Sequence, residues 1–163
     1  MNGYPKLFLP LLMLIVTTLF ISGLLLIPSF LTFRVQWDVE WLMESVLSSG
    51  DLRSWSTTIH AITGWIMIWI IGSLWSLHMR SHWRRNENRR NGLVFSAYWV
   101  LLLATSLGIY YFGDEFYSEY SSIIHVLLGL GLPIIFGLHY RHGKQALAKR
   151  NQTNGVVQPA SLK

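Results

Sequence analysis

The stretch SSIIHVLLGLGLPIIFGLHYR, residues 121–141, is the part of the sequence that decides the fold. It is apolar enough to cross a bilayer as a helix, and it carries no charged residue before Arg141. A histidine lies near each end, and titratable side chains inside a membrane span are costly and mark functional sites. The two histidines, His125 and His139, are 14 residues apart, so on a helix their rings leave nearly the same face, about 21 Å apart along the axis. This stretch therefore predicts half of a ligand set, with the other half on a second helix.

A second apolar stretch, residues 57–79, carries the matching pair, His60 and His78. Their spacing of 18 residues is five helical turns, so they share a face and lie about 27 Å apart. A glycine follows each outer histidine by four residues, Gly64 after His60 and Gly129 after His125, and leaves room on that face for a flat macrocycle to approach the backbone. Such a pair of helices predicts two b-type haems, each held by two imidazoles. The predicted axial ligands of the iron are His60, His78, His125 and His139.

The apolar residues of the 163-residue chain gather in four runs, each long enough to span a bilayer. The runs are residues 7–33, 57–79, 92–112 and 120–140. Charged residues would interrupt a soluble amphipathic helix at every turn, and these runs lack them. The sequence predicts an all-α membrane protein, a four-transmembrane-helix bundle in which residues 1–143 bind haem and residues 144–163 form a flexible cytoplasmic tail.

The sequence contains no cysteine. This excludes disulfides, Cys-ligated zinc, iron–sulfur clusters and covalently attached c-type haem, which requires a C-x-x-C-H motif. Any haem must therefore be held by axial ligands and non-covalent contacts.

Charge is sorted along the chain in a way that predicts topology. Basic residues follow the second and fourth runs, with five arginines in residues 80–90 and further cations from Arg141 onward, whereas carboxylates gather in residues 34–56 and 113–119. The positive-inside rule then places both termini in the cytoplasm of a bacterial inner membrane, with the two acidic loops outside. The net charge of +5 is thus a topology signal and an anionic-lipid contact, so we expect no nucleic-acid partner.

The first outer loop, residues 34–56, contains Trp37 and Trp41 near helical spacing. It predicts a short amphipathic helix in the outer interface, ended at Ser49-Gly50. Either an anchored connector or a docking ledge for a partner would suit this pattern.

The two halves of the chain also resemble each other. Ser22-Gly23 precedes an outer acidic loop and Ile59-His60, as Leu107-Gly108 precedes an outer acidic loop and Ile124-His125. This predicts a parallel repeat of two helices, with the histidine helices in equivalent, facing positions.

Two further histidines compete for the inner positions. His142 lies about 100° from the face of His125, against about 40° for His139, which favours His139. On the second run, His78 misses the depth of its partner by about one turn, whereas His82 misses it by about two turns and lies among arginines. We therefore expect His78 and His139 to bind the inner haem, and Arg80 or Arg141 could pair with its propionates.

At these residues the chain resembles the bacterial cytochrome b561 and hydrogenase/formate dehydrogenase cytochrome b superfamily, in particular its short four-helix members. The resemblance covers about residues 7–143 and is carried by the small-residue steps of the first and third runs, the two outer histidines with their glycines, and the closing sequence His139-Tyr140-Arg141-His142. It implies electron transfer across the membrane by b haems, between quinone and a periplasmic redox subunit. Several of those families take a ligand from the first helix, and this chain has no histidine there.

Three functions remain open from the sequence. The first is an electron-transfer or anchor subunit that relays electrons between the quinone pool and a periplasmic c-type cytochrome or catalytic subunit, with the redox chemistry supplied by the haems. The second is a self-contained membrane oxidoreductase, for example from superoxide to quinone. The third is a haem-free transporter or scaffold whose histidines bind zinc or copper.

Overall fold

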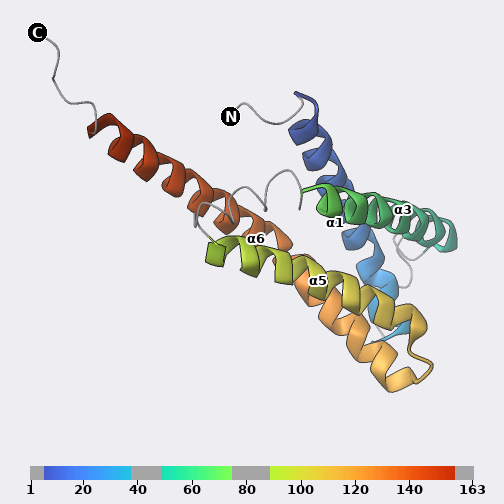
Figure 1. Cartoon of the computed structure of the whole chain (residues 1–163). Coiled ribbons are helices and arrows are strands. Elements are labelled where there is room, and N and C mark those ends of the chain that lie inside the picture. The colour runs from blue at the N-terminus through green and yellow to red at the C-terminus, as the bar shows by residue number, and fades with distance from the viewer. Residues whose placement is uncertain (1–5, 38–48, 75–88, 157–163) are drawn as a thin grey trace, which may run out of the picture.

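The computed structural model describes residues 6–37, 49–74 and 89–156, and these residues are helical wherever they are regular. The helices are α1 (Phe8–Phe33), α3 (Gly50–Leu74), α5 (Arg89–Tyr111) and α6 (Glu115–Val156) (Figure 1). All four are long and apolar enough to cross a membrane. Most of their large apolar side chains face outward, where only lipid would cover them. For the described residues, the prediction of an all-α fold with four helices long and apolar enough to span a membrane is confirmed.

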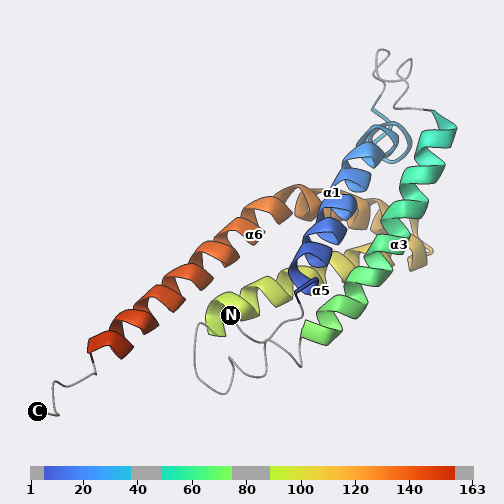
Figure 2. The ribbon, with the colours of Figure 1, turned by 90° about the horizontal axis from the view of Figure 1, so that it is seen from above.

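The four helices form two pairs. α1 packs against α3, α5 packs against α6, and a smaller contact between α1 and α6 joins the pairs (Figures 1 and 2). As the chain proceeds, α3 and α6 run in the same general direction in Figure 2. The two helices that carry the described intramembrane histidines are therefore the second members of their pairs.

The start of α3 corrects the predicted boundary of the second span. The helix begins at Gly50, seven residues before the predicted start at Thr57, and Gly50 was expected to end a helix. The N-terminus is fixed by polar contacts that an apolar run does not show: the Ser49 hydroxyl accepts a hydrogen bond from the N–H of Leu52 (3.2 Å), and Asp51 lies in the first turn. The predicted interfacial helix falls mainly on residues 38–48, outside the described residues.

α6 is longer than the span predicted from hydropathy. It begins after Asp114, whose carboxylate accepts from the N–H of Tyr117 (3.2 Å), and it continues to Val156. The first part of the region predicted as a flexible tail, residues 144–156, is thus helical. Its Lys, Gln, Ala and Arg residues favour a helix, although the segment as a whole is polar. Pro133 lies inside the helix without ending it, and the helix changes direction along its length in Figure 2.

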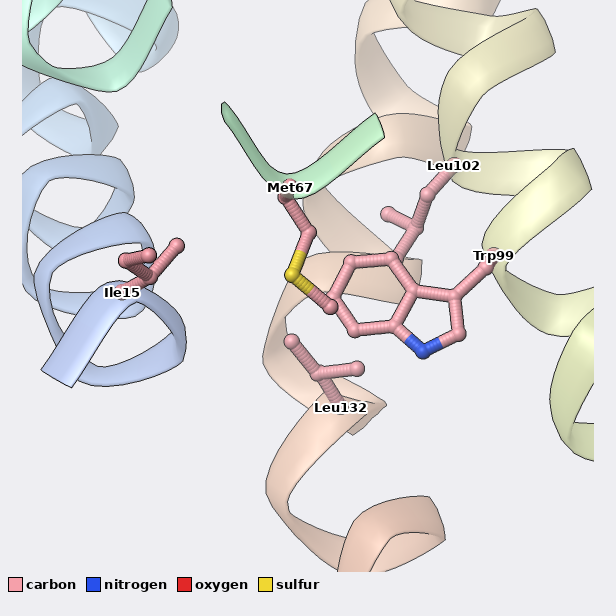
Figure 3. Close-up of a cluster of buried hydrophobic side chains, with 5 residues drawn as sticks. All are labelled: Ile15, Met67, Trp99, Leu102 and Leu132. Atoms are coloured by element: carbon pink, nitrogen blue, oxygen red, sulfur yellow. The ribbon is translucent and has the colours of Figure 1, made fainter. Parts of the chain in front are cut away.

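A small apolar core lies where the four helices meet. Its side chains come from every helix (Figure 3): Ile15, Met67, Trp99, Leu102 and Leu132. Met67 lies seven residues after His60, and Leu132 lies seven residues after His125. Seven residues are nearly two turns, about 10.5 Å, so these two core residues share faces with the outer histidines and lie deeper in the bundle.

α5 approaches α6 closely beside this core. The Tyr98 hydroxyl donates to the backbone carbonyl of Leu128, and a Cβ at Gly131 would lie 2.6 Å from the same hydroxyl oxygen. Gly131 therefore permits the approach that brings one face of α5 against the histidine face of α6.

Candidate functional site

The structure places the rings of His60 and His125 side by side between α3 and α6. Their centroids are 6.2 Å apart and their planes are inclined by 79°. The two residues come from different helix pairs, 65 positions apart in the sequence, and both rings are largely buried among the helices. The outer histidines of the two halves therefore meet at one depth.

His60 is held from α1. Its Nδ1 lies 3.1 Å from the Ser22 hydroxyl, and that hydroxyl also lies 2.7 Å from the carbonyl oxygen of Thr18 and 3.1 Å from that of Leu19. A carbonyl can only accept, so the single hydroxyl proton of Ser22 is directed into its own helix. The hydroxyl oxygen then accepts from Nδ1–H of His60, which leaves the lone pair of the imidazole on Nε2.

His125 is held in the same way from α5. Its Nδ1 lies 3.1 Å from the carbonyl oxygen of Leu102 and 3.0 Å from the hydroxyl of Thr105. The carbonyl requires Nδ1 to be the donor, and the Thr105 hydroxyl has its own acceptors, the carbonyls of Leu101 (2.8 Å) and Leu102 (3.0 Å). His125 therefore also carries its ring proton on Nδ1 and its lone pair on Nε2.

Two neutral imidazoles with free Nε2 lone pairs are suited to bind one metal ion between them. Metal–imidazole bonds are about 2 Å long, and two of them plus the distances from nitrogen to ring centre give a centroid separation of about 6 Å for rings on opposite sides of an ion. The observed 6.2 Å agrees with this. Within the described part of the chain, no group of three or more His, Cys, Asp or Glu side chains comes together. A haem, whose macrocycle supplies four nitrogens and requires two axial ligands, fits this donor set.

Glycines around the two rings differ in what they do. A Cβ at Gly23 of α1 would lie 3.1 Å from Cε1 of His60, so Gly23 lets α1 press against that ring. Gly64, predicted to make room for a macrocycle, has only a methyl group of Leu19 near its Cβ position, at 3.9 Å, and nothing lies within 4 Å of that position at Gly129. The space directly beside these two glycines is largely open, and their haem-binding role stays a prediction.

His139 lies farther along α6 and has different neighbours. Phe95 of α5 stacks on its ring with 4.2 Å between centroids and 16° between planes, and the Asn91 side-chain amide nitrogen lies 3.1 Å from its Nδ1. The same amide nitrogen lies 3.4 Å from the carbonyl oxygen of His139. The predicted partner His78 and its competitor His82 lie outside the described residues, and His142 is exposed.

Sequence analysis did not identify the residues that orient the rings as histidine partners. They are Ser22, Thr105 and Asn91, all on the helices without intramembrane histidines. For Ser22 and Thr105 the available signal was a hydroxyl in an otherwise apolar run, which in a membrane needs a partner. Asn91 follows Arg89 and Arg90 just before the run of residues 92–112 and carries no such signal. Arg34 was also missed: it lies on the side predicted to be outside and donates to the Ser118 hydroxyl (3.1 Å), so it links α1 to α6.

Comparisons with protein-family models, with curated proteins and with solved structures found no match to this chain. The class of protein is therefore defined by the fold and the site alone. It is a four-span helical membrane protein in which two intramembrane histidines from separate helix pairs face each other.

Proposed function

We propose that this protein is a di-haem b-type cytochrome that relays electrons across the membrane between the quinone pool and a periplasmic redox partner. The observation that supports this most is the approach of His60 and His125, 6.2 Å between ring centroids, with each Nδ1 bonded to an acceptor. Packing alone does not require two intramembrane imidazoles from separate helix pairs to lie beside each other.

In this proposal the chain supplies position and the haem supplies one-electron exchange at its iron. His60 and His125 would hold the outer haem, and His139 with His78 would hold the inner one. The core at Met67 and Leu132 lies about two turns inward of the outer histidines and would keep water out of the layer between the two haems. The glycines Gly64 and Gly129 would leave space for the outer macrocycle.

The proposed family is the cytochrome b561 and hydrogenase/formate dehydrogenase cytochrome b superfamily, on the resemblance of the histidine, glycine and small-residue pattern. The partner would be a periplasmic c-type cytochrome or a catalytic redox subunit, and the quinone would exchange electrons with a haem at the other end of the relay. This makes the chain an electron-transfer subunit more than a stand-alone enzyme.

The test is an optical spectrum of the purified protein, reduced minus oxidised, with haem and protein measured on the same sample. We expect two non-covalent haems per chain, both low-spin, because each iron would have two imidazole ligands. A colourless protein that binds zinc or copper through the same histidines would refute the cytochrome and favour a metal transporter. A single haem per chain, or a high-spin spectrum, would refute the two-site form.

The proposed topology places both termini and the arginine-rich segment in the cytoplasm of a bacterial inner membrane. Reporter fusions at Gly50 and Asn88 should then report opposite sides, with Gly50 outside. Fusions that report the same side would contradict this orientation.

A further inference from the structure

We infer that Ser22 and Thr105 set the reduction potential of the outer haem, by accepting the Nδ1 protons of its two axial ligands. This inference rests on the proposed function, since it requires iron between His60 and His125. It assigns a role to the two helices that carry no intramembrane histidine, α1 and α5.

The first step is that both hydroxyls can act only as acceptors toward the rings. Ser22 directs its proton to the carbonyls of Thr18 and Leu19, and Thr105 directs its proton to those of Leu101 and Leu102. Each hydroxyl bonds back into its own helix, so its oxygen lone pair is what faces the histidine of the neighbouring helix.

The second step is electronic. A hydrogen bond from Nδ1–H to an acceptor fixes the tautomer and makes Nε2 a stronger base. A more basic ligand stabilises ferric iron relative to ferrous iron, because ferric iron carries the larger charge. Both hydroxyls would therefore lower the reduction potential of the outer haem, one through His60 and the other through His125.

The third step is that each ring combines one side-chain hydroxyl with one backbone partner on the neighbouring helix. His60 has the Ser22 hydroxyl at 3.1 Å and also a hydrogen bond to the backbone of Leu19. His125 Nδ1 has the hydroxyl of Thr105 at 3.0 Å and also the carbonyl of Leu102 at 3.1 Å. No side-chain substitution removes the backbone partners, so loss of Ser22 and loss of Thr105 should each raise the potential while leaving the ligands in place.

The experiment is a redox titration of the purified full-length protein, fitted as two haems. The variants are Ser22→Ala, Thr105→Val and the conservative Thr105→Ser, which keeps the hydroxyl. The matched controls are Ser29→Ala, which removes a buried hydroxyl of α1 without a described partner, and Ser106→Ala, whose hydroxyl bonds to the carbonyl of Leu103 within its own helix (2.8 Å). Haem content is measured on every sample.

We expect Ser22→Ala to raise the potential of one haem component and leave the other unchanged. Outer-shell partners of a metal ligand are worth about 10–100-fold in metal affinity, and a tenfold loss confined to the ferric form corresponds to about 59 mV for a one-electron couple. Thr105→Val should raise the same component, and Thr105→Ser and both controls should leave it at the wild-type value.

The outcomes separate this inference from the proposed function. If the wild-type protein holds no haem, the proposed function fails and the inference fails with it. If wild type holds two haems but Ser22→Ala and Thr105→Val titrate like their controls, the proposed function stands and the inference is overturned. Should Ser22→Ala fail to accumulate in the membrane, the comparison of Thr105→Val with Thr105→Ser decides alone.

Discussion

His125 and His139 lie on one helix and are both held by α5, yet their Nδ1 atoms meet opposite chemistry. His125 faces a carbonyl and a hydroxyl that accept, which puts its proton on Nδ1 and frees Nε2. Nδ1 of His139 instead lies 3.1 Å from the side-chain amide nitrogen of Asn91, which is a donor, and the His139 ring also bonds to the backbone of Asn91. The two rings of α6 therefore have different hydrogen-bonding surroundings.

The Asn91 side chain carries both a donor and an acceptor, whereas the Leu102 carbonyl that faces His125 can only accept. Turning the Asn91 amide over presents its oxygen to Nδ1, which would move the ring proton to Nδ1 and free Nε2. The turn would give up the weaker contact to the His139 carbonyl, 3.4 Å long. In the proposed cytochrome, haem binding at the inner position would therefore depend on the orientation of the Asn91 side chain.

The largest expected effect concerns the outer pair. His60→Ala and His125→Ala should each abolish the outer haem and spare the inner one, because both rings are needed for one iron. The measurement is the reduced-minus-oxidised spectrum with the haem-to-protein ratio, which should fall from two to one in each variant. Different residual spectra for the two variants would show that these histidines do not share a haem.

The matching test of the inner site uses four substitutions. His139→Ala and His78→Ala should abolish the inner haem. His142→Ala and His82→Ala should leave both haems bound. His142 is exposed on α6, and His82 was predicted to miss the depth of its partner by about two turns and to lie among arginines. The same spectra and ratios apply. Loss of the inner haem on replacing His82 alone would show that His82, and not His78, is the ligand.

A smaller effect is expected where α1 touches the outer ring. Gly23→Val adds a Cβ at 3.1 Å from Cε1 of His60 and should push the ring away from Ser22, weakening the outer haem by about 10–100-fold, the range for lost outer-shell contacts. Gly72→Val on α3 is the control, because nothing lies within 4 Å of its Cβ position. Haem retention during dilution measures the difference, and equal retention in the two variants would remove Gly23 from the site.

The smallest effect sharpens the contrast between the two rings of α6. Asn91→Asp offers Nδ1 of His139 only acceptors, so it should lower the inner potential relative to Asn91→Leu, which offers none. The outer component of the same titration is the internal control. If the two variants titrate alike, Asn91 does not act on the inner haem through His139.

Much of the fold could be predicted from composition and periodicity. Four uninterrupted apolar runs require four helices in a bilayer, where every backbone polar group must be bonded within its own segment. The ends were predicted less well: α3 begins seven residues before its predicted start, and α6 continues into the region predicted as a tail. Caps such as Ser49 and Asp114, and helix-forming polar residues, decide those ends without changing hydropathy.

The candidate site likewise has features that follow from the sequence and features that only the tertiary structure supplies. The sequence by itself determined which histidines lie inside the spans, which face of each helix they share and which glycines follow them, because helical geometry turns spacing into direction and depth. Only the tertiary structure decided that His60 meets His125 and that Ser22, Thr105 and Asn91 face their rings. Those contacts join helices whose side chains meet through packing between elements, and the position of a ring proton depends on the atom across that gap, which no spacing within one helix encodes.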